Sequence, residues 1–201
     1  MNLRDMKKEA TAHALAEAAF ELAMERGLNG FVVEDVVQRA GYSRRTFANY
    51  YSCKEEAVAM AAEPFHDVEE ACEMLERMPE TATPLDALEQ FTKLRLTSEY
   101  FRRIRMLVTI ARAHPTLAPY ILSVHFKLQL AAQAVLNSLF HERYPEAYIR
   151  LLTSALTGAI MPMFDGSVNV LLPGQLPEEA PDSIAFEAYM DNVFGYLRNG
   201  F

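Results

Sequence analysis

Residues 40–56 of the chain are AGYSRRTFANYYSCKEE. Gly41 follows an apolar helical pattern over residues 33–40, and glycine is a residue type that ends helices. Ser43 is a residue type that caps the start of a helix, here one expected over residues 44–50. Two short helices joined by such a turn are typical of a helix-turn-helix, whose second helix enters the major groove of DNA. By spacing alone, a plain helical hairpin of a core, with Arg44 and Arg45 on a solvated face, is the open alternative.

The second helix of this motif has one apolar and one polar side. Phe47 and Tyr51 are four positions apart, which predicts that they form its buried face. The other side chains suit DNA, because Arg can donate two hydrogen bonds to guanine, Asn can pair with adenine, and phosphates pass the helix ends. The predicted DNA-binding residues are Ser43, Arg44, Arg45, Thr46, Asn49, Tyr50 and Lys54.

The distribution of charge agrees with a local contact to phosphate. The formal net charge is −8, which disfavours nucleic acid as a partner of the whole surface. Residues 36–54, however, contain four basic residues and no acidic one. A short cationic strip in an acidic protein suits a partner that meets one edge only.

The stretch from Ala14 through Gly27 to Glu56 resembles the DNA-binding domain of the TetR (tetracycline repressor) family. The resemblance implies a homodimer that binds a pseudo-palindromic double-stranded DNA operator and a small-molecule effector. Val32 stands where the family usually has a threonine that contacts phosphate, and Ala48 stands where an aromatic residue is usual. Both departures concern contacts with DNA rather than the fold.

The composition predicts an all-α chain of nine or ten helices. The chain has 201 residues, of which 51% are hydrophobic and 23% charged, so a disordered chain is excluded. Glycine and proline are few, at eight and ten, and no strand is expected. Two cysteines make no disulfide framework, which favours the cytoplasm. No apolar stretch is long enough for a membrane span, and no secretory signal is recognised.

Two domains are expected, a helix-turn-helix domain over residues 1–52 and a helical effector-binding and dimerisation domain over residues 53–201. A linking helix is predicted over residues 53–78, capped by a box from Ser52 to Glu55 and pivoting at Pro64. Thr83 and Ser98 are expected to cap the next two helices. Further helices are predicted over residues 116–142, 146–164 and 183–198.

The second domain offers candidates for two surfaces. Methionine and aromatic side chains suit an irregular apolar ligand, although such residues more often form plain core. The predicted ligand-binding residues are Phe65, Phe91, Phe101, Met106, Phe126, Gln129, Met161 and Phe164. The predicted dimer-interface residues, on the last two long helices, are Leu152, Leu156, Ile160, Phe186, Tyr189, Val193 and Phe194.

Weaker signals have ordinary structural explanations. Arg102, Arg103 and Arg105 could hold an acidic ligand, but a solvated face paired with Glu99 is favoured. Cys53 could sense oxidants, but a purely structural role as a small side chain is favoured. The His66–Glu73 segment has metal-like spacing without a second ligand pair, so no metal site is predicted.

No catalytic constellation is recognised, so the chain is expected not to be an enzyme and to need no cofactor. The prediction is therefore a ligand-responsive DNA-binding regulator, of repressor type. Two alternatives stay open, a small helical enzyme acting on an apolar acyl or aromatic substrate, and a helical adaptor that no longer binds DNA.

Overall fold

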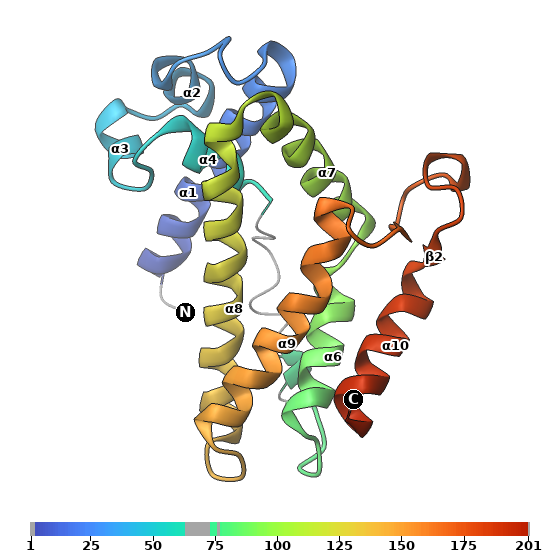
Figure 1. Cartoon of the computed structure of the whole chain (residues 1–201). Coiled ribbons are helices and arrows are strands. Elements are labelled where there is room, and N and C mark those ends of the chain that lie inside the picture. Colours follow the sequence, from blue (N-terminus) through green and yellow to red (C-terminus); the bar gives the residue numbers. More distant parts are fainter. Residues whose placement is uncertain (1–2, 63–72, 76, 201) are drawn as a thin grey trace. The chain divides into compact units, whose positions relative to one another are not determined.

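The computed structural model describes residues 3–62, 73–75 and 77–200, and this part of the chain is helical apart from two very short strands (Figure 1). The all-α prediction is therefore confirmed. The chain forms two compact units, Met1–Phe65 with Arg103–His125, and His66–Arg102 with Phe126–Phe201. The predicted functional division at residues 52 and 53 stays a prediction.

The first unit contains the N-terminal helices. These helices are α1 (Leu3–Arg26), α2 (Val33–Ala40), α3 (Arg44–Ala48) and α4 (Lys54–Met60). The unit also includes residues from Arg103 onward of α7 (Ser98–Ala113), the 3-10 turn η1 (Pro115–Leu117), and the first eight residues of α8 (Ala118–Phe140). Gly27 and Gly41 end α1 and α2 with φ of +71° and +74°, a conformation that glycine adopts without strain.

The core of the first unit lies on one face of α1. Leu15 and Leu22 are fully buried there, as are Val36 of α2 and Val58 of α4. Leu107 of α7 is fully buried as well. Burying a side chain of this size contributes about 1.5–3 kcal/mol, so this cluster supplies much of the unit's stability.

Ion pairs hold the other helices of this unit to α1. Arg103 of α7 donates two hydrogen bonds to the Glu17 carboxylate, at 2.6 and 2.9 Å, and a third to the Ala61 carbonyl at the end of α4. Arg39 of α2 donates two to Glu25 at 2.8 and 2.6 Å. The hydrogen bond from Arg39 holds the pKa of Glu25 below its ordinary value.

The second unit contains three long helices and a small parallel strand pair. They are α6 (Pro84–Arg95), α9 (Glu146–Asp165) and α10 (Phe186–Asn199), together with residues from Phe126 onward of α8. Strand β1 (Val170–Leu171) pairs with β2 (Ile184–Ala185), with Val170 opposite Ile184, and the 3-10 turn η2 (Pro177–Glu179) lies between them.

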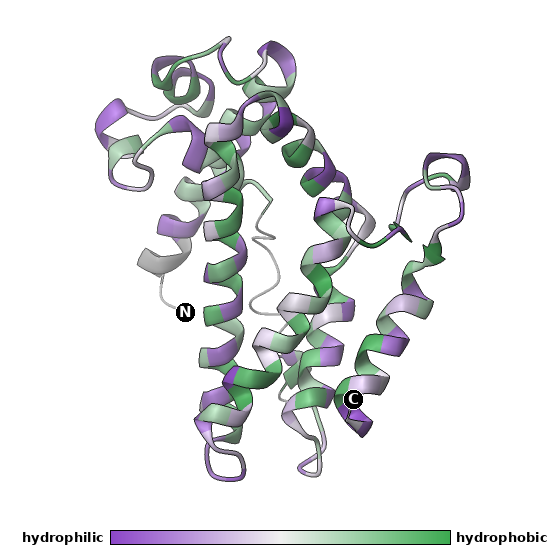
Figure 2. Cartoon of the chain, viewed as in Figure 1, coloured by the Kyte–Doolittle hydropathy of each residue, from purple (hydrophilic) through white to green (hydrophobic). Residues whose placement is uncertain are grey.

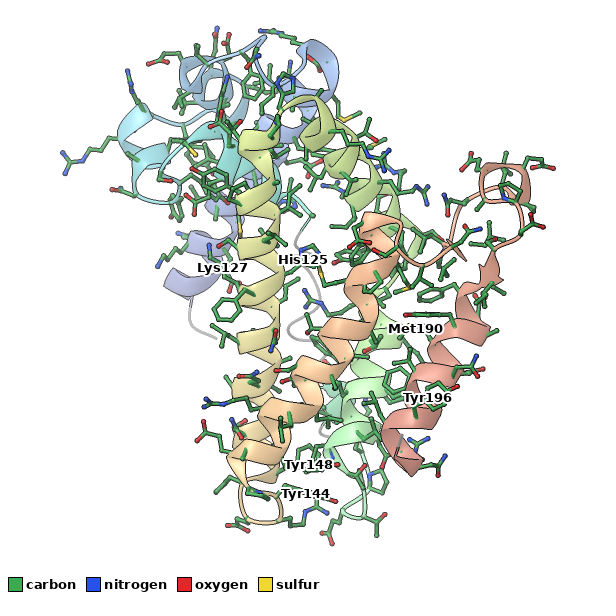
Figure 3. All side chains as sticks on the ribbon, in the orientation of Figure 1. His125, Lys127, Tyr144, Tyr148, Met190 and Tyr196 are labelled. Atoms are coloured by element: carbon green, nitrogen blue, oxygen red, sulfur yellow. The ribbon has the colours of Figure 1, made fainter. Side chains whose placement is uncertain are left out.

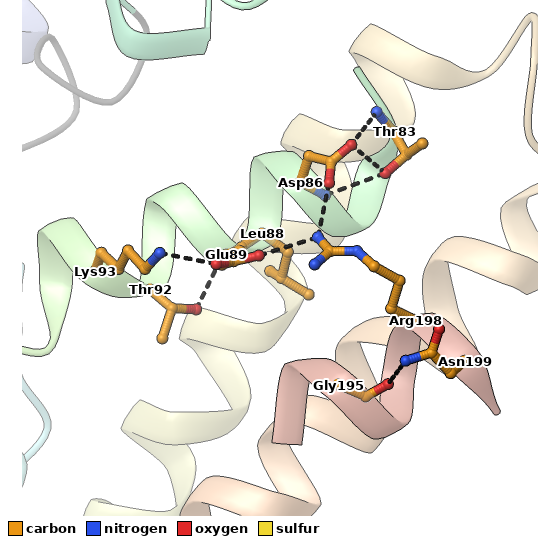
Figure 4. A network of polar contacts seen from close by, with 9 residues as sticks. All are labelled: Thr83, Asp86, Leu88, Glu89, Thr92, Lys93, Gly195, Arg198 and Asn199. Atoms are coloured by element: carbon orange, nitrogen blue, oxygen red, sulfur yellow. Dashed lines mark hydrogen bonds and ion pairs between the residues drawn. The ribbon is translucent and has the colours of Figure 1, made fainter. Parts of the chain in front are cut away.

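Helix α6 presents a polar side to α10. Arg198 of α10 donates to Asp86 at 2.8 Å and to Glu89 at 3.0 Å, and Lys93 donates to Glu89 at 2.8 Å (Figure 4). Asp86 also accepts hydrogen bonds from the amide and hydroxyl of Thr83, the predicted N-cap, and these bonds lower the pKa of Asp86. The network joins the C-terminal end of α10 to the first half of α6.

Helices α8 and α9 are joined by two amide side chains. Gln129 donates to the Ser154 hydroxyl and Gln133 to the Thr153 hydroxyl, each at 2.9 Å. Tyr189 of α10 donates to the Ala159 carbonyl of α9 at 2.7 Å. These bonds satisfy polar groups on helices whose packed faces are otherwise apolar.

Several predicted boundaries are wrong. Helix α4 ends at Met60 rather than near residue 78, and residues 63–72 and 76, including the expected pivot Pro64, lie outside the described residues. Its N-cap is Cys53, while Glu56 accepts from the amide and hydroxyl of Ser52, so the capping register is shifted by one residue. The amide of Tyr100 donates to the hydroxyl of Thr97, not of Ser98.

The C-terminal segment also differs from expectation. Strand β1 was not expected, and β2 occupies the start of the helix predicted over residues 183–198, so α10 begins at Phe186. Helix α9 is long and apolar enough to cross a membrane by length and composition alone, a test that core helices of soluble proteins also pass. The hydropathy colours of Figure 2 show apolar residues on α8 and α10 too. Leu152 and Leu156 of α9 are buried inside the protein.

His125 of α8 (Figure 3) makes the stability of the fold dependent on pH. Burial lowers the pKa of its imidazole below the ordinary 6.5, although Nδ1 bonds the Ile121 carbonyl. The unfolded chain therefore takes up the proton first as pH falls. The corresponding stability is fully present above pH 6.5 and is lost as pH falls below that value.

We expect the free energy of unfolding, measured by urea titration, to fall between about pH 7.5 and about pH 5, and to fall less in His125→Gln. The control is His141→Gln, because His141 is exposed. Equal pH dependence in the wild type and in His125→Gln would contradict this assignment.

Candidate DNA interface and ligand pocket

Helix α3 is anchored by its apolar side. Phe47 and Tyr51 are buried, with ring centroids 5.7 Å apart, as the spacing predicted. The Tyr51 hydroxyl donates to the Ala12 carbonyl of α1 at 2.8 Å. The polar side of α3 is consequently turned away from the core, and Arg44, Arg45 and Asn49 are exposed there. The start of α3 is hydrophilic in Figure 2.

The first turn of α3 is closed by the predicted cap. The Ser43 hydroxyl accepts from the Thr46 amide at 3.0 Å and lies 2.8 Å from the Thr46 hydroxyl. Both hydroxyls are therefore engaged with each other, and Thr46 is half-buried. Tyr50 is also half-buried and follows the C-terminal end of the helix.

The two arginines differ in their surroundings. Arg44 forms an ion pair with Glu34 of α2, with 2.6 Å between Nη1 and Oε1. Both side chains are more than half exposed, so the pair contributes little to stability and can be exchanged for a phosphate. Arg45 has no hydrogen bond or ion pair with any residue in the described part of the chain.

Lys54 has a structural role that its sequence position did not suggest. Its ammonium donates to the Leu28 carbonyl at 2.6 Å and to the Phe31 carbonyl at 2.7 Å, and it lies 4.8 Å from the centroid of the Phe31 ring. An ammonium has three donors, so two of them hold the loop between α1 and α2. A contact between Lys54 and phosphate stays a prediction.

Two residues beside this surface were missed from the sequence. Tyr42, in the turn before Ser43, is exposed and carries a hydroxyl suited to phosphate. Glu34 partly neutralises the surface through Arg44. The position of Tyr42 next to the cap could have indicated it, whereas the Glu34–Arg44 pair depends on the packing of α2 against α3. Val32, at the N-cap of α2, is exposed and offers no hydroxyl there.

The second unit contains an apolar pocket between α6 and α8. Its volume is about 190 Å³, and its walls include Leu88 and Phe91 of α6 and Ala132 and Leu136 of α8. Arg95 lies at the pocket with its guanidinium carbon 5.0 Å from the centroid of the Phe91 ring. Phe91 is the predicted ligand-binding residue that lines this pocket.

The structure does not bring the other predicted ligand residues that it describes to this pocket. Phe101 and Phe164 are buried in an aromatic cluster with ring centroids 5.7 Å apart, next to Tyr100, whose pKa burial raises to about 12. Gln129 is bonded to Ser154, and Phe126 is exposed. Met106 and Met161 are half-buried, and Phe65 lies outside the described residues.

The predicted dimer residues divide into two groups. Leu152, Leu156 and Phe194 are buried within the protein itself. Those that are half-buried, and so leave part of their surface to solvent, are Ile160, Phe186, Tyr189 and Val193. The most exposed apolar side chain of α9 is Leu151, and that of α10 is Tyr196 (Figure 3).

Arg102, Arg103 and Cys53, the weaker candidates for a functional role, have partners within the protein. Arg102 pairs with Glu99, and Arg103 pairs with Glu17. The Sγ of Cys53 accepts from the Glu56 amide at 3.4 Å. Among the described residues, no group of three or more His, Cys, Asp or Glu side chains is arranged to hold a metal ion.

Replacing Lys54 with methionine should destabilise the protein by about 1–3 kcal/mol, because two carbonyl groups would lose a charged donor. The measurement is urea unfolding followed by circular dichroism. Lys8→Met is the control, since Lys8 is exposed on α1. Equal stability of Lys54→Met and Lys8→Met would show that the two hydrogen bonds contribute nothing.

Comparisons with known proteins agree with this geometry. Residues 15–59 match the family model of bacterial regulatory proteins of the tetR family. Among curated proteins, no sequence matches the chain. Eleven chains of solved structures match it. One is a structure assigned to the TetR family of transcriptional regulators, from Mesorhizobium loti MAFF303099.

That structure is 17% identical to this chain, covers 98% of it and 97% of its own length, and superposes with a TM-score of 0.52. At this identity the likeness shows a shared fold. The match over residues 15–59 spans the helix-turn-helix and the helices that hold it. Residues 15–59 are therefore similar to the DNA-binding domain of bacterial regulatory proteins of the tetR family.

Proposed function

We propose that the chain is a cytoplasmic, homodimeric repressor that binds a pseudo-palindromic DNA operator and is released from it by a small apolar or amphipathic molecule. The observation that carries the proposal is the division of α3 into two sides. Phe47 of α3 is buried, and Tyr51, three residues after the helix, donates to the Ala12 carbonyl of α1. Arg44, Arg45 and the C-cap residue Asn49 are exposed on the other side. This arrangement suits a helix that enters a major groove.

The proposed contacts follow from the surroundings of each side chain. Arg45 donates to guanine or to phosphate without first breaking an ion pair with a described residue. Arg44 must first exchange Glu34 for DNA. Asn49 pairs with adenine, and Tyr42, Tyr50 and the third donor of Lys54 contact the phosphate backbone. Ser43 and Thr46 chiefly fix the helix start through their own hydrogen bond.

The proposed ligand response uses helices that continue through both units. Side chains of α8 between Leu128 and Leu136 form a wall of the apolar pocket, and residues 118–125 of the same helix belong to the first unit. Arg103 of α7 bonds α1 and the end of α4. A ligand that binds the DNA-free conformation more tightly shifts the population toward it, whereas equal affinity for both conformations shifts nothing.

Alanine at Arg45 should weaken operator binding by about 1–3 kcal/mol, or roughly 5-fold to 150-fold. The loss in Arg44→Ala should be smaller, and Glu34→Gln should strengthen binding, because Glu34 competes with DNA for Arg44. The measurement is fluorescence anisotropy on a duplex selected from a random library, at several salt concentrations. Each lost phosphate contact lowers the salt slope by about one.

Arg112→Ala is the matched control, because Arg112 is an exposed arginine at the end of α7. Unchanged affinity in both Arg44→Ala and Arg45→Ala would contradict the assigned contacts. Failure to select any duplex would favour the adaptor that does not bind DNA.

Leu151→Glu should convert the proposed dimer to a monomer, because it places a charge on the exposed apolar face of α9. Light scattering would report the loss of half the mass, and operator affinity would fall because two linked half-sites bind more tightly than one. Leu176→Glu is the control, since Leu176 is equally apolar and exposed but lies before η2. A dimer that survives Leu151→Glu would place the interface elsewhere.

A further inference from the structure

The two acidic residues in the first turn of α2 have different partners. Asp35 accepts from the Val32 amide at 2.8 Å, which closes the start of α2, and it pairs with Arg26 at 3.4 Å. Glu34 instead reaches the neighbouring helix α3 (Figure 1), where its carboxylate accepts from Nη1 of Arg44 at 2.6 Å. Asp35 therefore stabilises its own helix, whereas Glu34 places a negative charge on the proposed DNA-binding surface.

A short turn keeps Glu34 next to α3. The Tyr42 amide in this turn donates to the Val37 carbonyl at 2.9 Å, and the Ser43 cap begins α3 one residue later. Because the two helices are joined so closely, the Glu34 backbone does not follow Arg44 when that side chain turns toward another acceptor. The Glu34 carboxylate therefore stays near whatever Arg44 contacts.

Glu34 offsets a large part of the positive charge on this surface. Helix α3 itself has two charged residues, Arg44 and Arg45, and both are exposed. The next basic residues along the chain are already engaged, since Arg39 is held by an acid of α1 at 2.6 Å and Lys54 by two backbone carbonyls. The single negative charge of Glu34 thus lies beside one of the two exposed cations of α3.

This negative charge acts unequally on the two kinds of acceptor that DNA offers to Arg44. A phosphate that binds Arg44 brings a second negative charge next to the Glu34 carboxylate, and two like charges about 5 Å apart in water weaken binding by about fourfold. A guanine edge presents two neutral acceptors, O6 and N7, and brings no such charge. Phosphate contacts carry no sequence information directly, whereas contacts to base edges do.

We propose that Glu34 is a specificity-determining residue, which weakens the contact of Arg44 with phosphate more than its contact with guanine and so suppresses binding to unrelated DNA. The inference rests on the proposed function, because it requires a preferred duplex. Removing the charge of Glu34 frees Arg44 for phosphate on any sequence. The operator complex gains less, because Arg44 contacts a base there.

The test measures Kd by fluorescence anisotropy at low salt for two duplexes of equal length and composition, one selected from a random library and one scrambled. In Glu34→Gln, we expect binding to the scrambled duplex to become about threefold to fivefold tighter, and binding to the selected duplex less than about twofold tighter. For the scrambled duplex, the slope of log Kd against log salt should steepen by about one, because one phosphate contact is gained.

Glu146→Gln is the matched control, because Glu146 is also exposed and also pairs with an arginine, Arg150, but lies on α9. It removes the same charge and should change both affinities by the same factor. In Arg44→Ala, the additional replacement of Glu34 should no longer steepen the salt slope, since Arg44 makes the phosphate contact. Circular dichroism melts verify that each variant is folded.

The possible failures are distinguishable. Equal gains on both duplexes in Glu34→Gln, or weaker binding to both, would overturn the role of Glu34 and leave the proposed function intact. A salt slope that steepens just as much when Arg44 is alanine would also overturn that role, because the charge would then act without Arg44. A wild-type chain that prefers no selected duplex over the scrambled one would overturn the proposed function and this inference with it.

Discussion

The hydrogen bond from the Tyr51 hydroxyl to the Ala12 carbonyl, together with buried Phe47, is the constraint on which the DNA-binding surface depends. Helix α3 has five residues, and helices shorter than about 12–15 residues are marginal in water by themselves. Its shape and direction therefore come from what it is fastened to. The Ser43 cap closes its first turn, and its buried side chains fix which residues remain outside.

Side-chain hydrogen bonds also hold the other elements of the first unit in place. Lys54 holds the loop before α2 through two carbonyl groups, and Arg39 and Arg103 bond α2 and α7 to α1. In the second unit, α6 contacts α10 with one face and borders the apolar pocket with another. Its acidic side is neutralised by Arg198, while its apolar side borders the pocket and ends at Arg95.

Local patterns predicted the local structure well. Gly27, Gly41 and the Ser43 cap mark helix ends through conformations and hydrogen bonds made within a few residues, and the buried pair on α3 follows from helical spacing. Contacts between distant segments leave no such pattern. The carbonyl partners of Lys54 are 23 and 26 residues away, and Glu17 is 86 residues from Arg103. The pocket likewise depends on how α6 meets α8, so among the predicted ligand residues that the structure describes, Phe91 alone lines it.

Hydrogen exchange with and without a selected operator duplex tests the central claim most directly, because it reports which amides are covered without changing any residue. We expect new protection in peptides that span residues 42–50, with no change in the buried part of α1 around Leu15 and Leu22. Protection that appears on α9 or α10 instead, with residues 42–50 exchanging as in the free protein, would contradict the account.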